Sequence, residues 1–131
     1  MTIMKATRPV KIPIYPNRVT YKSPIIIGST RYMFRFRYVR RSDRWHFDIE
    51  TMNGEPIVRG IRIVTGWPLL APYGDNRLPG NKNEGEIICY RTDGSKEDPG
   101  LQDFGKNAML VYFPDGIPSK VPDPPLIFEI I

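Results

Sequence analysis

The sequence predicts an all-β protein: a single small antiparallel β-barrel or sandwich with a long apolar loop and an extended C-terminal arm. The 131 residues include 14 prolines and 11 glycines, which indicate many turns and extended connections. No window of 11 or more residues has an apolar repeat at helical spacing without a proline or glycine, so we expect little helix. Short segments instead alternate apolar and polar residues, the pattern of half-buried strands.

The first expected element is an edge strand over residues 8–16, because its prolines cannot donate ladder hydrogen bonds. Residues 17–22 are too short and mixed to assign. The β-branched segment 23–28 is expected to form a strand that pairs with the next one through a turn at Gly28-Ser29.

Residues 29–64 are predicted to form three strands joined by two short turns. In the first strand the aromatic residues have one parity and the arginines the other, and the second strand repeats this alternation. A four-residue loop at 40–43 keeps both apolar sets on one face. The expected cross-strand pairs are Phe36 with Phe47, Phe34 with Ile49, Tyr38 with Trp45, and Arg35 with Asp48.

The second turn contains Asn53-Gly54, a strong signal for a type I′ turn. Counting from it places Gly60 opposite Phe47, so we expect a bulge at Arg59-Gly60 that returns the following isoleucines to the apolar face. The alternative is a type I turn with a bulge at Gly54. The predicted core face consists of Tyr32, Phe34, Phe36, Tyr38, Trp45, Phe47, Ile49, Ile61 and Ile63.

The long segment 65–83 begins too apolar for a solvated linker. We expect Trp67, Leu69, Leu70 and Tyr73 to fold over an open end of the sheet. Two further strands are predicted at 86–92 and 107–113, separated by a charged, turn-rich connection.

Residues 1–113 are expected to form the β domain and residues 114–131 a proline-rich arm. Five prolines between positions 114 and 125 favour an extended path, and the last six residues are almost wholly apolar. We expect the arm to leave the globule and contact another subunit through Leu126, Ile127, Phe128, Ile130 and Ile131. The alternative is that it folds back as an edge strand of its own sheet.

The formal net charge of +5 divides into +9 for residues 1–62 and −4 for residues 63–131. Such an asymmetry is typical of a protein that binds nucleic acid or an acidic protein surface, or whose copies contact one another head to tail. The alternative is that the charges of the two halves are interspersed over the surface of one globular domain. A basic ridge contains Arg31, Arg35, Arg37, Arg40, Arg41 and Arg44. Arg35, Arg37, Arg40 and Arg41 are the candidate interface residues. The aromatic residues have the opposite parity, so they are expected in the core rather than in a base-stacking platform.

The sequence shows no recognisable pattern of catalytic residues. We therefore expect no enzymatic activity, no cofactor and no metal. His46 and Cys89 are the only histidine and cysteine, which excludes an internal disulfide and a Cys/His zinc site. His46 is expected on the charged face and Cys89 in the core. The sequence shows no signal peptide pattern or membrane span, so a soluble protein is expected.

Residues 45–48, 53–64 and 69–73 resemble the baseplate plug family of contractile-tailed phages, first described in a cyanophage. The likeness covers about residues 10–113 and leaves out the proline-rich arm. It implies a structural plug in the central hub of the tail baseplate, without catalytic residues and without a membrane. The implied partners are other baseplate hub and tail-tube proteins, in several copies, within a virion assembled in the host cytoplasm. The alternative from the residues alone is a basic β-sheet module that binds nucleic acid.

Overall fold

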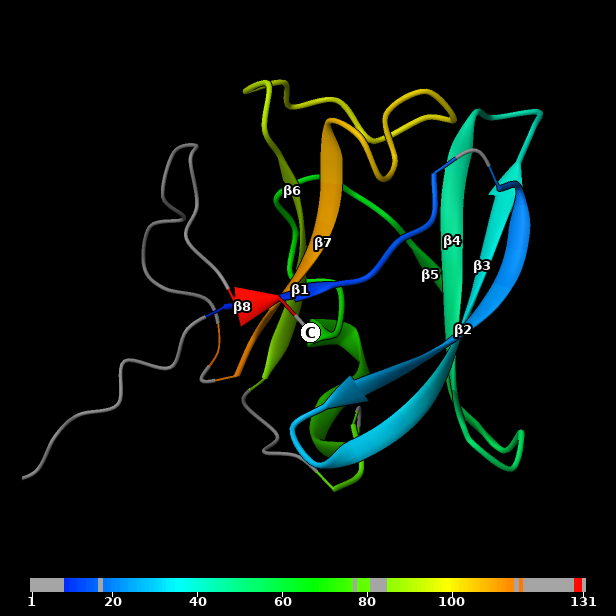
Figure 1. Cartoon of the computed structure of the whole chain (residues 1–131), viewed down its shortest axis with the longest axis vertical. Helices are drawn as coiled ribbons and strands as arrows, with labels where there is room; N and C mark the ends of the chain where they lie inside the picture. The colour runs from blue at the N-terminus through cyan, green and yellow to red at the C-terminus, as the bar shows by residue number, and fades with distance from the viewer. Residues whose placement is uncertain are drawn as a thin grey trace, which may run out of the picture.

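The computed structural model describes residues 9–16, 18–76, 78–80, 85–114, 116 and 129–130. It is a sandwich of two four-stranded sheets, with strand orders β2-β3-β4-β5 and β6-β7-β1-β8 (Figure 1). The strands are β1 (Val10–Ile12), β2 (Thr20–Ile27), β3 (Thr30–Val39), β4 (Arg44–Thr51), β5 (Pro56–Arg62), β6 (Glu86–Arg91), β7 (Ala108–Phe113) and β8 (Glu129–Ile130). The described strands form two separate sheets, so the sandwich is confirmed over the barrel.

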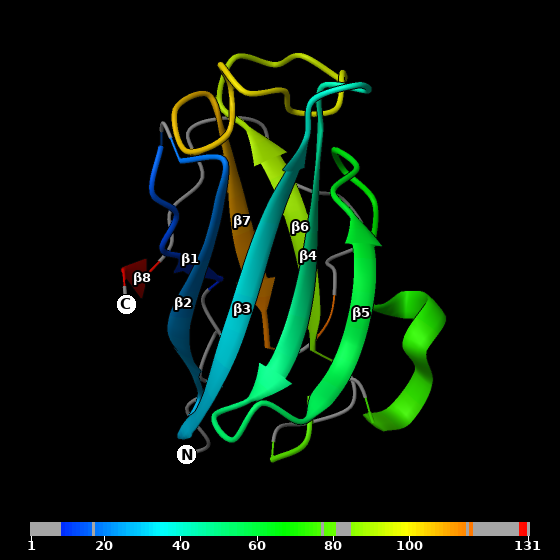
Figure 2. The ribbon, with the colours of Figure 1, turned by 90° about the vertical axis from the view of Figure 1, so that its right-hand side faces the viewer.

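In the β2–β5 sheet (Figure 2), β3 and β4 pair in the predicted register. Phe36 pairs with Phe47, Phe34 with Ile49, Tyr38 with Trp45, and Arg35 with Asp48. The hairpin between β2 and β3 turns at Gly28-Ser29, also as predicted. Strand β2 begins at Thr20 and so includes part of the segment that the sequence left unassigned. Its Pro24 is tolerated because β2 is an edge strand, hydrogen-bonded on one side only.

Strand β5 contains the predicted bulge. Phe47 pairs with Ile61 and Ile49 with Val58, so β5 has one residue more than β4 between these pairs. Gly60 has a φ of 70°, and its N–H donates to Asp48 Oδ1 at 2.7 Å instead of to the ladder. The bulge thereby returns Ile61 to the core side of the sheet, where it is buried.

The turn between β4 and β5 is not the expected type I′ turn. Such a turn needs positive φ at both central residues, but in the described part of the chain Asp43 is the only non-glycine residue with positive φ. Gly54, with a φ of 86°, donates its N–H to the Thr51 carbonyl at 2.9 Å. Asn53 therefore lacks the required conformation, and the alternative with a bulge at Gly54 describes the turn.

The core lies between the two sheets. Eight of the nine predicted core residues are buried, and Tyr38 is half-buried at the end of its strand. Phe34 stacks on Phe47 with ring centroids 5.7 Å apart. Phe104, which the sequence did not single out, closes one end of the core with its ring 4.8 Å from that of Trp45. Strands β6, β7 and β1 supply Ile87, Cys89, Leu110, Tyr112 and Ile12 from the opposite side.

Strand β1 is not the predicted edge strand, because it lies between β7 and β8. It pairs antiparallel with β7, through Val10 and Tyr112, and parallel with β8, through Val10 and Glu129. This pairing follows the alternative in which the arm returns to its own sheet, and differs from the prediction that the arm leaves the globule. Leu126, Ile127, Phe128 and Ile131 lie outside the described residues.

The apolar segment after β5 only partly covers the core. Leu69 and Leu70 are buried, whereas Trp67 is 59% exposed and Tyr73 39% exposed, so the prediction for these two residues was wrong. The Leu69 N–H donates to the Ile87 carbonyl at 3.0 Å, and the Leu70 N–H donates to Glu86 Oε1 at 2.6 Å. These bonds hold Leu69 and Leu70 along β6 with their side chains in the interior, and Leu78 further along the segment is buried as well. The 3₁₀ turn η1 (Ala71–Asn76) follows, and the described residues contain no α-helix.

Candidate interaction surfaces

The outer face of the β2–β5 sheet carries the charges that the strand parity predicted. Lys22, Arg35 and Asp48 are successive cross-strand partners on this face. The Arg35 guanidinium lies 3.5 Å from Glu50, and that of Arg37 lies 3.2 Å from Asp48. Both carboxylates are nearly buried. These ion pairs offset much of the charge of Arg35 and Arg37, two of the four predicted interface arginines.

His46 lies on the same face, between Arg37 and Arg62 in the cross-strand register. The pKa of His46 is lowered from its ordinary value of 6.5. Partial burial is the largest cause, and the positive charges of Arg37 and Arg62 add to it. The imidazole is therefore neutral at pH 7 and adds no charge to the face. This is the cross-strand position that the sequence predicted.

The loop at 40–43 presents the other two predicted interface residues. Arg40 and Arg41 are exposed, and neither makes an ion pair with another described residue. The loop is closed by a hydrogen bond from the Asp43 N–H to the Arg40 carbonyl at 3.3 Å. Asp43 has a φ of 53°, the left-handed conformation that aspartate tolerates better than most residues.

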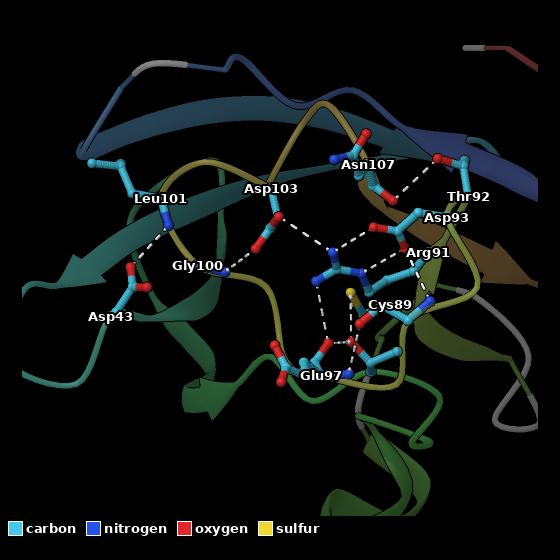
Figure 3. Close-up of polar contacts among 12 residues, drawn as sticks. Asp43, Cys89, Arg91, Thr92, Asp93, Glu97, Gly100, Leu101, Asp103 and Asn107 are labelled. Atoms are coloured by element: carbon cyan, nitrogen blue, oxygen red, sulfur yellow. Dashed lines mark hydrogen bonds and ion pairs between the residues drawn. The ribbon is translucent and has the colours of Figure 1, made fainter.

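Asp43 holds this loop against the rest of the molecule. Its Oδ1 accepts a hydrogen bond from the Tyr38 hydroxyl. The same oxygen accepts one from the Leu101 N–H at 3.0 Å (Figure 3). These bonds lower the pKa of the Asp43 carboxyl, and the bond to Asp43 raises the pKa of Tyr38. A Cβ on Gly100 would lie 2.5 Å from Asp43 Oδ2, so this close approach depends on glycine.

Beside the loop is a shallow hollow of about 350 Å³, lined by Val19, Thr20, Tyr38, Arg40 and Leu101. Val19 is 54% exposed and supplies apolar surface next to a guanidinium. The sequence did not identify this hollow, because its lining comes from three segments far apart in the chain.

A buried arginine fixes the 92–107 connection that carries Leu101. The Arg91 guanidinium binds both oxygens of Asp93, at 3.0 and 2.8 Å, and also Asp103 Oδ1 at 3.2 Å (Figure 3). The hydrogen bonds from Arg91 lower the pKa of Asp93 to about 2, and the bonds to Asp93 raise the pKa of Arg91. The signal available in the sequence was an arginine at a strand end followed by several acidic residues.

The core also anchors this connection. Trp45 Nε1 donates a hydrogen bond to the Gly100 carbonyl at 3.2 Å, next to the residue that contacts Asp43. Asp98 lies 3.5 Å from the Arg62 guanidinium and accepts the Thr65 N–H at 3.1 Å. The connection and the 40–43 loop therefore form one rigid end of the sandwich, and Arg40 and Arg41 project from it.

The described residues offer no group of three or more His, Cys, Asp or Glu side chains that could hold a metal ion. Cys89 is a core residue, as predicted, and burial raises the pKa of its thiol to about 12, so it is not a thiolate at neutral pH. Within the described part of the chain, no helix is long and apolar enough to cross a membrane.

The chain was compared with known protein families. The family model described as "Cyanophage baseplate Pam3 plug gp18" matches residues 10–115. The match spans strands β1 to β7 and the rigid loop end, and it stops before β8. No curated protein matches the chain.

Proposed function

We propose that this chain, which belongs to the cyanophage baseplate plug family, binds neighbouring proteins of the tail hub through its basic loop at 40–43. Membership of the family gives it a structural role in the baseplate of a phage tail. The proposed partners are other hub and tail-tube proteins, with several copies in each baseplate assembled in the host cytoplasm. The outer face of the β2–β5 sheet continues the proposed contact surface.

The observation that carries this proposal is the pair of exposed arginines, Arg40 and Arg41, which form no ion pair with another described residue and stand on a loop that is already held in place. Asp43 binds the loop to Tyr38 and to Leu101, so little conformational freedom is left to lose when a partner binds. Complementary charge across an interface fixes register and excludes wrong partners more than it adds affinity. An acidic protein surface is therefore the partner that this end of the sandwich suits.

Nucleic acid is the less supported partner. Binders of single strands combine basic residues with aromatic side chains on which bases stack. Here the aromatic side chains of β3 and β4, such as Phe34 and Phe47, are buried between the sheets, and the arginines lie on the opposite face. The basic face therefore has the charge for phosphates without a stacking platform from these strands.

Charge reversal in the full chain tests the proposal. We expect the double variant Arg40→Glu/Arg41→Glu to keep the wild-type melting temperature, because both side chains are exposed. Its incorporation into baseplates, measured after co-expression with the other baseplate proteins of the same phage, should fall at least about tenfold. This corresponds to roughly 1.4 kcal/mol of lost binding. The control Lys96→Glu/Lys106→Glu makes the same change of charge at exposed positions of the adjoining 92–107 connection, and its normal incorporation would assign the contact to the 40–43 loop itself.

Normal incorporation of the Arg40→Glu/Arg41→Glu variant would contradict the proposal. A second measurement addresses nucleic acid directly. Tight binding of single-stranded DNA by the isolated protein, weakened steeply by salt and abolished by Arg35→Ala with Arg37→Ala, would favour the alternative function.

A further inference from the structure

Strands β6 and β7 are buried on both faces. Ile87, Cys89 and Leu110 point into the sandwich core, as alternation along the strands requires. The intervening residues form a second apolar cluster on the outer face of the same strands. It consists of Ile88, Tyr90, Met109, Val111 and Phe113, and none is more than 8% exposed.

The other sheet does not cover this second cluster. The β2–β5 sheet lies on the opposite side of β6 and β7 (Figure 1). Within the described residues, no further hydrophobic side chain belongs to the cluster. The five side chains are nevertheless buried, although no other described hydrophobic side chain packs with them.

The chain path around this face is constrained by its two fixed ends. Tyr112 and Glu129 both pair with Val10, from opposite sides of β1. The end of β7 and the start of β8 are therefore two strand spacings apart, about 10 Å. The 15 residues between Phe113 and Glu129 reach about 50 Å when extended. This is far more chain than the direct connection needs, and the inner face is already filled by the core.

The connecting segment has the apolar composition expected of a chain that packs on the outer face of β6 and β7. It contains five prolines together with Ile117, Val121, Leu126, Ile127 and Phe128. Proline-rich, extended segments bind shallow apolar surfaces that carry aromatic residues, and Tyr90 and Phe113 supply these here. One row of cross-strand partners crosses the sheet from β6 to β8, the strand at the end of the arm. It consists of Ile88, Val111, Lys11 and Ile130.

We propose that the outer face of β6 and β7 is the docking surface for the chain's own segment of residues 114–128, which joins β7 to β8. This inference does not depend on the proposed function. It assigns the apolar arm a binding site that needs no second subunit, and it leaves the basic loop end of the sandwich free for partners.

A truncated chain and a peptide test this proposal. A variant that ends at Gly116 should keep the circular dichroism spectrum of a β-sandwich and bind a dye specific for exposed apolar surface several-fold more strongly than the full chain. A synthetic peptide of residues 114–131 should bind the truncated protein and abolish the extra dye binding. The same peptide with Leu126→Ser, Ile127→Ser and Phe128→Ser should bind at least about tenfold more weakly. A chain lacking residues 1–8 is the control and should bind no more dye than the full chain.

The full-length chain gives a second test that does not require the truncated protein to fold. A Met109→Cys variant should react slowly with a maleimide, and should react several-fold faster when Leu126→Ser, Ile127→Ser and Phe128→Ser are added. Equal reaction rates, or dye binding that rises on removal of residues 1–8 instead, would overturn the proposal. A full-length dimer that the peptide dissociates would place the segment on a second copy, and would likewise overturn the intramolecular assignment.

Discussion

Replacing Phe47 by alanine removes the side chain at the centre of the sandwich. Phe47 is fully buried in β4. Its cross-strand partners are Phe36 in β3 and Ile61 in β5. Its ring is stacked on that of Phe34 at 5.7 Å and lies 6.0 Å from that of Phe36. Its neighbours are held by strands on both sides, so they cannot close the resulting cavity by a small shift.

The expected loss of stability follows from this geometry. Truncation of a buried phenylalanine to alanine costs about 3–5 kcal/mol, and each aromatic pair contributes about 0.5–1.5 kcal/mol beyond burial. We expect about 4 kcal/mol for Phe47→Ala. With an unfolding entropy of about 2.1 cal/mol/K per residue, this lowers the melting temperature by roughly 15 °C.

Urea unfolding and thermal melting of the purified protein measure this change. The matched control is Arg59→Ala on the neighbouring strand, where an exposed side chain is shortened and the free energy of unfolding should change by less than about 0.5 kcal/mol. A Phe47→Ala protein that loses less than about 1 kcal/mol would refute the assignment of this face to the core.

Two further predictions concern the outer side of the same sheet. Gly60→Ala should lower the free energy of unfolding, measured in urea, by about 1–2 kcal/mol, because alanine is strained at a φ of 70°. The added Cβ meets no atom within 4 Å, so no steric clash adds to this loss. An unchanged stability would exclude the bulge conformation. The pKa of His46 is lowered in the folded chain, so the unfolded chain binds more protons as the pH falls through 6.5. The folded state should therefore lose stability as the pH falls through 6.5 toward the lowered pKa of the folded chain. The variant His46→Gln should reduce this loss, and an identical pH dependence would contradict the assigned environment.

Local alternation was enough to predict most of the β2–β5 sheet. The parity of Phe36 and Phe47 fixed the register of β3 against β4, because a slip of one residue would expose every aromatic side chain. The same counting revealed the bulge at Gly60. It did not distinguish the two turn types at Asn53-Gly54, since that dipeptide is compatible with both and the outcome depends on the backbone of Asn53 alone.

Contacts between segments far apart in the sequence could not be predicted from local residue patterns. The prolines near β1 indicated an edge strand, whereas pairing with β7 and β8 joins the two ends of the chain and places β1 inside the sheet. The candidate surface shows the same limit. Sequence parity placed Arg35 and Arg37 on the outer face, but their ion pairs with Glu50 and Asp48, and the support of the 40–43 loop by Leu101, appear only in three dimensions.

Amide hydrogen exchange of the chain, free and within assembled baseplates, tests the central claim most directly. The account predicts slower exchange in the baseplate for the amides of residues 40–43 and for the neighbouring Leu101, while the amides of the buried strands β4 and β7 exchange equally in both states. Unchanged exchange at residues 40–43, with protection confined to other parts of the surface, would contradict it.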